Sequence, residues 1–401
     1  MYKYLVIALY FSLSGTLKAQ QTYLSPSELA GQLNTVTTMV PFLTISPDSR
    51  SASMGDVGVA LFNPDANSTA WNGANLVFAE KKTGFSLSYA PWLRQLVDDV
   101  GFSYLSGYSK IGKKGVVSGS FRYFSLGNIN FTDYEGQPTG SFNPNEFAFD
   151  IGYSTAFSNK FAMGVNIRYI YSNIVGSGVR DYTAGTSIAG DVSLIYKDEF
   201  RIAGKKHKFN FGMNIQNIGS KMTYSSREKR DFIPTNLKLG VGYKYDIDDH
   251  NKIHAYFDLN KLLVPTRPYY LSNWNNSGDS INASSGKAVI IGQDPNVSPI
   301  QGIVQSFNDA PGGFKEEIKE WTPSAGIEYI YDNAFTVRSG VFYEAATKGN
   351  RKYITAGFGL KFQSLTVDAA YLVPLVSRHP LQNQMRFSLL FDMASLTDSG
   401  K

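Results

Sequence analysis

Apolar and polar residues alternate with a period of two in many short segments from residue 83 onward, and turn residues bound each segment. In residues 354–362, for example, Ile354 and Phe358 share one face, and Thr355 lies on the other. Successive side chains of a β-strand point to opposite faces, so each segment has one apolar and one polar face. The pattern predicts an all-β protein. It is either a soluble sandwich or barrel with the apolar face inward, or a membrane barrel with that face outward.

Three features favour the membrane barrel. The polar faces carry charges of both signs, which suits a hydrated lumen. The apolar faces often end in tyrosine, as an aromatic girdle at a lipid interface does. The last alternating segment, 386–391, lies close to the C-terminus, where it can close the sheet and remove an unpaired edge that lipid does not tolerate. The charges expected in the lumen are Arg122, Asp150, Arg168, Asp191, Asp258, Glu328, Arg338, Asp368 and Arg386, and the girdle tyrosines are Tyr123, Tyr153, Tyr169, Tyr243, Tyr329, Tyr331, Tyr343 and Tyr371.

The connections between about fourteen such segments alternate between short and long, as in outer-membrane barrels with short periplasmic turns and longer external loops. The short connections are 111–114, 158–160, 198–206, 246–251, 332–333 and 363–364, of which the third is intermediate in length. The long connections are 128–145, 173–183, 220–234 and 265–321, with smaller loops near Lys348 and His379. We therefore predict a 14-stranded antiparallel transmembrane β-barrel over residues 83–393, with a long extracellular loop at 265–321 and a C-terminal tail at 394–401.

The N-terminus predicts export. Lys3, a short apolar run and small residues up to Ala19 form the pattern of a signal peptide over residues 1–19, and the run is shorter than the roughly 20 residues that span a bilayer. The absence of cysteine excludes disulfides and thiolate metal sites. No cluster of lysine and arginine suggests nucleic acid as a partner.

Residues 20–82 do not alternate, but they are too apolar for a solvated linker. We expect this segment to be a plug, or hatch, packed inside the lumen, as in other outer-membrane barrels. The apolar residues behind this expectation are Val40, Phe42, Leu43, Ile45, Met54, Val57, Val59, Leu61 and Phe62.

The stretches 50–60 and 65–74 resemble the N-terminal hatch of the FadL-like fourteen-stranded barrels. The residues that carry this hatch motif are Arg50, Gly55, Asp56, Asn67, Trp71 and Asn72. More narrowly, residues 37–50 resemble the opening of the PorV (LptO) family of the type IX secretion system of Bacteroidetes. One departure is Gly73, which stands where the hatch motif usually has proline; glycine lacks the fixed φ of proline, so it does not set the local conformation.

The resemblance implies an outer-membrane protein, exposed at the cell surface, that binds the C-terminal signal domains of secreted cargo. Such a protein would take cargo from the translocon barrel and deliver it to the surface attachment complex, without a cofactor. A FadL-like transporter of hydrophobic molecules is the alternative, and a lipid A deacylase is a third. The charges expected in the lumen favour a sealed or polar interior over an apolar transport pocket.

Catalytic and metal-binding patterns are weak. The four histidines, His207, His250, His254 and His379, form no grouping with a nucleophile that spacing alone reveals, and His254 is expected in the lumen at the periplasmic end of its strand. The aspartates at 246, 248 and 249 lack the glycine and terminal glutamate of a calcium loop, so a solvated turn is the better interpretation. We expect no enzyme and no metal site.

The long loop at 265–321 is rich in apolar residues, and loops of this length are usually functional or disordered. Such a loop either folds over the barrel mouth or contacts a partner, and the sequence favours neither. The loop at 131–142 is a second candidate surface. The candidate partner-binding residues are Phe131, Tyr134, Phe142, Tyr269, Tyr270, Trp274, Ile290, Ile291, Phe307 and Phe314.

Overall fold

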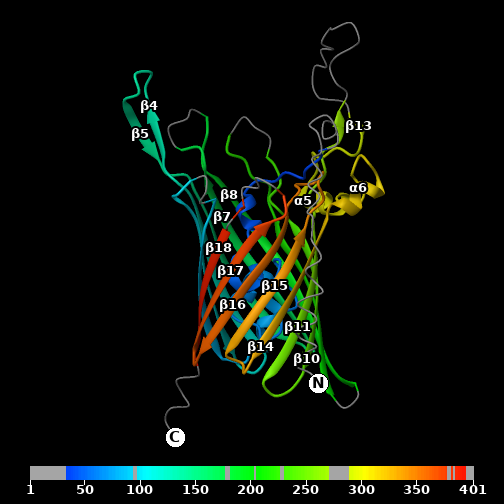
Figure 1. Cartoon of the computed structure of the whole chain (residues 1–401). Coiled ribbons are helices and arrows are strands. Elements are labelled where there is room, and N and C mark those ends of the chain that lie inside the picture. The colour runs from blue at the N-terminus through cyan, green and yellow to red at the C-terminus, as the bar shows by residue number, and fades with distance from the viewer. Residues whose placement is uncertain are drawn as a thin grey trace.

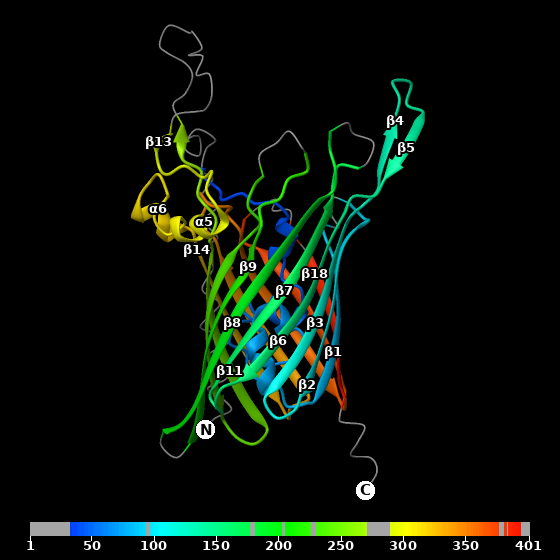
Figure 2. The same cartoon turned by 180° about the vertical axis from the view of Figure 1, so that it is seen from behind.

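Fourteen antiparallel strands form one closed barrel in the computed structural model (Figures 1 and 2). The structure describes residues 33–93, 97–176, 181–202, 205–225, 230–270, 289–376, 381–382 and 384–393. The predicted signal peptide and C-terminal tail lie outside these ranges. The barrel strands are β1 (Thr83–Pro91), β2 (Val100–Ile111), β3 (Gly115–Leu126), β6 (Asn145–Ala156), β7 (Phe161–Asn173), β8 (Gly185–Ile202), β9 (Lys205–Gly219), β10 (Asn236–Asp246), β11 (Asn251–Leu262), β14 (Trp321–Tyr331), β15 (Phe335–Tyr343), β16 (Lys352–Phe362), β17 (Leu365–Pro374) and β18 (Gln384–Met393).

Neighbouring strands in the chain pair with each other around the barrel, and β18 closes the ring by pairing with β1, where Phe391 lies opposite Phe85. The strand count and the closure observed in the structure therefore confirm the prediction from the alternating sequence. No edge strand is left in the barrel, so the strands satisfy one another's backbone hydrogen bonds as lipid requires.

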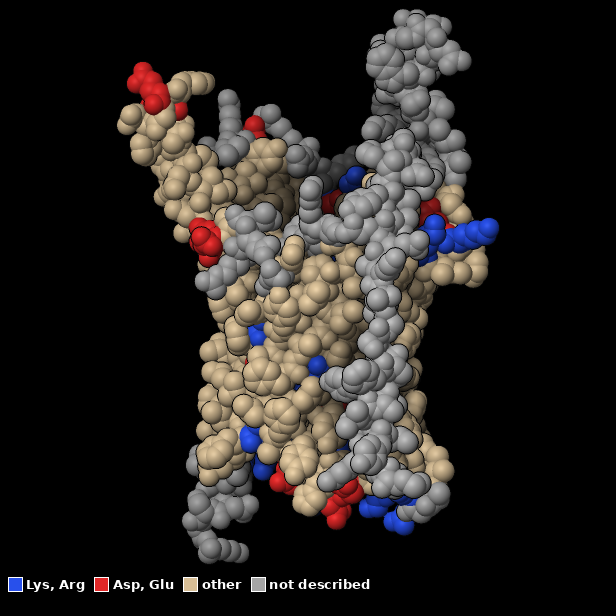
Figure 3. Space-filling view, viewed as in Figure 1, with Lys and Arg blue, Asp and Glu red and all other residues tan. Residues whose placement is uncertain are grey.

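The two faces of the wall are oriented as the sequence predicts. All nine charged residues expected in the lumen are buried, and all eight tyrosines of the expected girdle are exposed. Figure 3 shows few charged side chains on the middle of the wall that faces the viewer and more at both ends. An apolar outer belt around a polar interior is the reverse of a soluble barrel and suits a lipid surrounding. No helix of the described ranges is long and apolar enough to cross a membrane.

The connections divide the barrel into a turn end and a loop end (Figures 1 and 2). The prediction of a connection at 198–206 was wrong, because β8 and β9 continue as a paired hairpin up to Ile202 and Lys205. Lys208 and Glu199 form an ion pair of 2.5 Å between the two strands in this extension. Asp198 interrupts the apolar face of β8 before Phe200 and Ile202 resume it, so the pattern alone indicates a loop, whereas cross-strand pairing decides the structure.

The loop end carries additional elements. The connection between β3 and β6 contains a two-stranded hairpin of β4 (Ile129–Thr132) and β5 (Pro138–Phe142). The connection between β11 and β14 contains the short strands β12 (Tyr269–Tyr270) and β13 (Val289–Ile291). Two helices follow in the same connection, α5 (Pro299–Gln305) and α6 (Phe314–Lys319).

The N-terminal segment lies inside the barrel as a plug (Figures 1 and 2). It contains η1 (Pro41–Thr44), α3 (Ser49–Ala52), α4 (Ser68–Trp71) and η2 (Gly73–Phe78), joined by short turns. The nine apolar residues behind the plug prediction are buried, apart from the partly buried Ile45. Its backbone binds the wall directly: the amides of Gly58 and Val59 donate to Asp258 at 2.7 and 3.1 Å. The polar inner face of the barrel therefore serves as the binding surface for the plug.

Two glycines of the plug differ in what they require. Gly55 has φ +73°, and a Cβ at this position would lie 2.4 Å from the carbonyl oxygen of Val341, so the turn needs glycine. Gly73 lies outside the left-handed region, and a Cβ there would meet the Asn166 side chain at an ordinary 3.4 Å. Position 73 therefore does not require glycine, and another residue could adopt the same local conformation of the plug.

Candidate functional site

The hatch residue Arg50 ties the plug to the barrel wall. Its guanidinium donates to both carboxylate oxygens of Glu328 on β14, at 3.2 and 3.1 Å, and to the Phe62 carbonyl within the plug at 2.8 Å. Arg338 on β15 donates to the same carboxylate at 2.7 Å and to Asp368 at 2.5 Å. All of these groups are buried, so each charge has the partners that burial demands.

The other hatch residues have similar positions within the plug and against the wall. Gly55 donates its amide to Thr355 at 2.8 Å, and Asp56 accepts from the Tyr353 hydroxyl at 2.5 Å. Trp71 donates to a plug carboxylate, that of Asp48, at 2.6 Å.

The two asparagines of the motif complete this arrangement. The Asn72 amide donates to the carbonyls of Val59 in the plug and Leu194 in the wall, both at 2.9 Å. Asn67 is buried and accepts from the Ser106 hydroxyl of β2 at 3.4 Å. The hatch motif thus forms the polar contact between plug and wall.

The two candidate partner surfaces lie on opposite sides of the barrel mouth (Figures 1 and 2). The β4–β5 hairpin extends away from the barrel and exposes Phe131 and Tyr134, whereas Phe142 is half-buried at its base. The helices α5 and α6 lie at the opposite rim, next to the end of β14. The structure therefore brings the candidate residues into two separate groups.

The exposed apolar face of α5 and α6 contains more residues than the candidates Phe307 and Phe314. Ile300, Val304 and Ile318 are also more than half exposed. Residues four apart lie on the same side of a helix, so 300 and 304, and 314 and 318, form continuous stripes. The helical spacing in the sequence could have identified them, but the segment was interpreted as a loop.

Four other candidates of the long loop lie in the short paired strands β12 and β13. Tyr269 in β12 pairs with Ile291 in β13, next to Tyr270 and Ile290. The orientation of these four side chains is not described, and Trp274 lies outside the described residues. Their partner-binding role stays a prediction.

A buried ionic cluster fastens α6 to the rim. Lys261, at the end of β11, lies 3.1 Å from Glu317 and 2.5 Å from Glu320. Lys348, in the loop between β15 and β16, lies 2.9 Å from Glu320 and 2.6 Å from Glu316. Residues from the end of one strand and from two separate connections therefore meet at one point.

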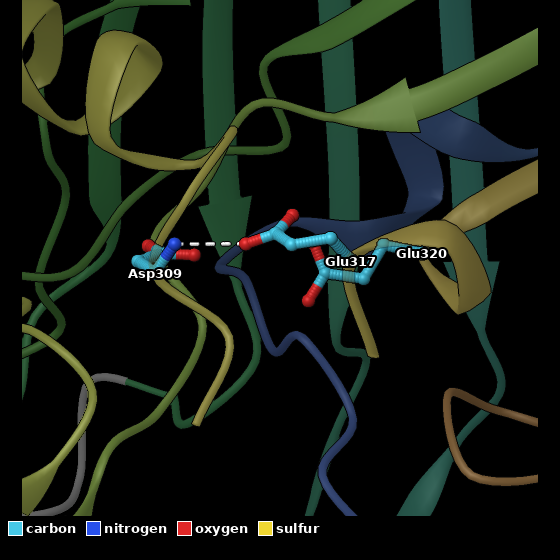
Figure 4. A group of neighbouring side chains, drawn as sticks. All are labelled: Asp309, Glu317 and Glu320. Carbon is cyan, nitrogen blue, oxygen red and sulfur yellow. Dashed lines mark hydrogen bonds between the residues drawn. The ribbon is translucent and has the colours of Figure 1, made fainter. Parts of the chain in front are cut away.

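Asp309 completes the cluster beside Glu317 and Glu320 (Figure 4). The backbone amide of Asp309 donates to Glu317 at 2.8 Å, and the Asp309 carboxylate accepts from the Thr266 amide at 3.0 Å. Burial raises the pKa of Asp309 to about 7, and the neighbouring carboxylates of Glu320 and Glu317 act in the same direction. One carboxyl of the cluster thus titrates near neutral pH.

Oxygen atoms of these three carboxylates lie within 4.8 Å of one another, a spacing that suits a metal ion. Lys261 already places its ammonium between Glu317 and Glu320, and Glu317 also accepts two backbone amides. The positive charge that the cluster requires is therefore supplied by lysine, and we assign it to fastening α6.

A cavity of about 430 Å³ opens at the mouth, between the plug and the walls of β10, β11, β15 and β16. Trp71 and Lys238 lie on its plug and wall sides, with the Lys238 ammonium 4.3 Å from the centre of the Trp71 ring. Its lining is rich in threonine, asparagine and charged residues. Neither this cavity nor the place of Lys238 in it follows from the sequence, because the cavity walls come from strands far apart in the chain.

His254 lies buried in the lumen near the turn end, as predicted. Its Nδ1 is 3.0 Å from Glu328 and 3.2 Å from the Tyr256 hydroxyl, and its ring contacts Phe62 of the plug. Because it shares Glu328 with Arg50 and Arg338, His254 belongs to the contact between plug and wall.

Comparisons with known proteins agree with this architecture. The family model described as "Type IX secretion system protein PorV" matches residues 28–269, more than half of the chain. A search of the curated proteins finds no match.

Among solved structures, the toluene transporter TodX of Pseudomonas putida is 12% identical with a TM-score of 0.45, covering 85% of this chain and 95% of TodX. A FadL homologue of Pseudomonas aeruginosa is 12% identical with a TM-score of 0.40, covering 90% and 99%. LpxR of Salmonella typhimurium is 7% identical with a TM-score of 0.32, covering 77% and 100%. Likenesses of this size carry no argument about activity. The match to the family model decides the assignment: the chain belongs to the PorV family of the type IX secretion system and is a β-barrel of the outer membrane.

Proposed function

We propose that this barrel is a carrier that binds the C-terminal signal domains of secreted cargo at its loop end. It receives cargo from the translocon barrel and delivers it to the surface attachment complex. In this proposal the loop end faces the cell exterior and the turn end faces the periplasm, as the short turns of outer-membrane barrels do.

The observation that carries the proposal is the contrast between a filled lumen and apolar loops. The plug occupies the interior through buried ion pairs and backbone hydrogen bonds. Exposed Phe131, Tyr134, Phe307 and Phe314 gather at one end, outside the membrane-facing wall. Exposed apolar groups away from lipid favour protein contacts over passage of a solute through the barrel.

The mouth cavity is mixed: its exposed surface is more apolar than polar, but charged residues such as Lys238, Arg351 and Glu344 stand at its walls. A pocket for hydrophobic molecules is mostly apolar with only a few polar groups. These wall charges therefore count against the alternative of a transporter for hydrophobic molecules. A lipid A deacylase requires a nucleophile with an adjacent base, and the described contacts of His254 are a carboxylate and a tyrosine.

The test is recovery of partners from native outer membrane with an affinity-tagged full-length protein. We expect the translocon barrel and cargo signal domains to copurify with the wild-type chain. A variant with Ile300→Ser, Val304→Ser, Phe314→Ser and Ile318→Ser should retain less cargo, because it loses the apolar face of α5 and α6.

The matched control changes Lys315 and Lys319 to serine on the exposed part of α6. It alters the same helix without removing apolar surface, and cargo recovery should be unchanged. Recovery of neither the translocon nor cargo with the wild-type chain would contradict the carrier function. Equal recovery with the apolar and control variants would move the cargo surface away from α5 and α6.

A further inference from the structure

Lys238 is an unpaired cation in the mouth cavity. Three cations line this cavity, and two of them are paired: Arg351 binds Glu344 at 2.9 and 2.8 Å, and Lys348 binds Glu320 at 2.9 Å. Among the described residues, no carboxylate lies within ion-pair distance of the Lys238 ammonium, which lies over the face of Trp71. An ammonium placed over an aromatic ring at the side of a cavity retains donors for an anion.

Two asparagines beside Lys238 also have unused hydrogen-bonding capacity. Lys238 lies directly opposite Asn260 in the pairing of β10 with β11, and Asn236 is two residues away on the same face of β10. The side-chain oxygens of both asparagines are buried, without a partner among the described residues. The oxygen and nitrogen of an asparagine amide are assigned from its hydrogen bonds, so a rotated amide presents donors at the same positions. One ammonium and two amides therefore form a patch of donors on one wall.

The opposite side of the cavity carries unpaired backbone. Residues 35–38, here called the crossing segment, pass over the mouth at the start of the plug (Figure 1). The Asn34 amide on one side donates to the Thr347 carbonyl at 3.1 Å, and the Met39 amide on the other donates to Phe232 at 2.8 Å. Between these anchors, no backbone group of the crossing segment bonds to a described residue. A segment that is anchored at both ends and has free backbone N–H and C=O groups is suited to pair with the backbone of another polypeptide.

We propose that the mouth cavity binds the carboxy-terminal end of a partner polypeptide. Its terminal carboxylate lies at Lys238, Asn236 and Asn260, and its backbone runs along the crossing segment. The cavity of about 430 Å³ is within the range of roughly 300–1,000 Å³ for small-ligand sites, so it accommodates a chain end and not a folded domain. The charged and amide groups at its walls favour a peptide over an acyl chain with the same carboxylate. This inference rests on the proposed carrier function and specifies which part of the cargo enters the barrel.

The experiment measures binding of a cargo C-terminal signal domain to the purified full-length barrel in detergent. The domain is prepared in two forms, one with a free terminal carboxylate and one with a terminal amide. The barrels are wild type, Lys238→Met, Lys238→Arg and the control Lys244→Met. Lys244 lies on the same strand but does not line the cavity, so it tests loss of one positive charge alone. The thermal transition of each variant checks that the barrel is folded.

We expect the wild-type barrel to bind the carboxylate form about tenfold more tightly than the amide form, the size of effect that one charge-assisted hydrogen bond gives. Lys238→Met should remove this preference, whereas Lys238→Arg and Lys244→Met should retain it. Equal binding of both forms by the wild type, or an undiminished preference in Lys238→Met, overturns the inference and leaves the carrier function standing. Failure of both forms to bind the wild type overturns the carrier function itself. Displacement of the domain by dodecanoate through Lys238 would instead assign the cavity to acyl ligands.

Discussion

The plug and the α5–α6 segment are both held by buried ion pairs, but by different cations. Arg50 and Arg338 bind Glu328 at the plug, whereas Lys261 and Lys348 bind Glu317 and Glu320 at the rim. The planar guanidinium binds carboxylates in a fixed geometry, whereas the lysine ammonium is a point charge on a flexible stem. We infer that the plug contact is the rigid part of the molecule and that the rim contact is able to rearrange.

The largest expected effect comes from removing the carboxylate that Arg50 of the plug shares with Arg338 of the wall. Glu328→Ala leaves Arg50 and Arg338 buried without this partner, and breaking a buried pair costs about 3–5 kcal/mol. Urea unfolding in lipid vesicles measures the loss. Asp392→Asn is the control, because the pair of Asp392 with Lys361 spans 3.9 Å near the surface and should contribute less than about 1 kcal/mol. Similar losses in the two variants would contradict a rigid plug contact.

A smaller effect should follow from crowding the plug at Gly340 on β15. A Cβ at this position would lie 2.1 Å from the Met54 carbonyl carbon, so Gly340→Ala must displace plug backbone, at about 1–3 kcal/mol. We expect the Gly340→Ala variant, and not the wild type, to conduct ions across planar bilayers. Gly119→Ala is the matched control, since its Cβ would meet only the Asp150 carbonyl oxygen at 3.4 Å. Absence of conductance in Gly340→Ala would show that the contact between plug and wall adapts as readily as the rim contact.

The rim contact should weaken as pH rises. The pKa of Asp309 is raised from 3.8 to about 7, so the folded state holds a proton that the unfolded chain loses. Docking of α5 and α6 therefore loses stability as pH increases from about 4 to about 7. The pKa of Glu316 is lowered, with Lys348 as its hydrogen-bonded partner. The stability that this ion pair contributes to docking is therefore lost only below pH 4.5.

Hydrogen exchange of residues 299–319 at pH 5, 6 and 8, corrected for intrinsic rates, measures this change. We expect several-fold more frequent opening at pH 8 than at pH 5. Asp309→Asn should abolish the difference in residues 299–319. An unchanged pH dependence in Asp309→Asn would assign the titration to another group.

The smallest effect on stability is expected at the tip of the β4–β5 hairpin. Phe131→Ser with Tyr134→Ser should change the free energy of unfolding by less than about 0.5 kcal/mol, because both side chains are exposed. Partner recovery from native membranes should nevertheless fall. The control is Thr132→Ser, which leaves the apolar surface of the hairpin intact. A destabilised hairpin variant, or unchanged recovery, would show that these aromatic residues do not form a partner surface.

The sequence by itself determined the strands, their number and their two faces. A period of two places alternate side chains on opposite sides, so the buried charges such as Arg168 and the exposed tyrosines such as Tyr169 follow from neighbouring positions alone. The alternation of short and long connections gave the two ends. The pattern failed at 198–206, because Asp198 interrupts the apolar face of β8 before Phe200 and Ile202 resume it, and only the pairing with β9 shows that the strand continues.

Only the tertiary structure decided which distant residues meet. Lys261 comes from the end of β11, and Asp309 and Lys348 come from two different connections. Lys238 and Trp71 come from a strand and the plug, so no spacing in the sequence predicts these contacts. The barrel closes through register between strands, and that register places Lys238 opposite Asn260 at the mouth. Periodicity is a local property that sequence records directly, whereas a cavity and an ionic cluster exist only once the closed barrel sets the distances between its walls.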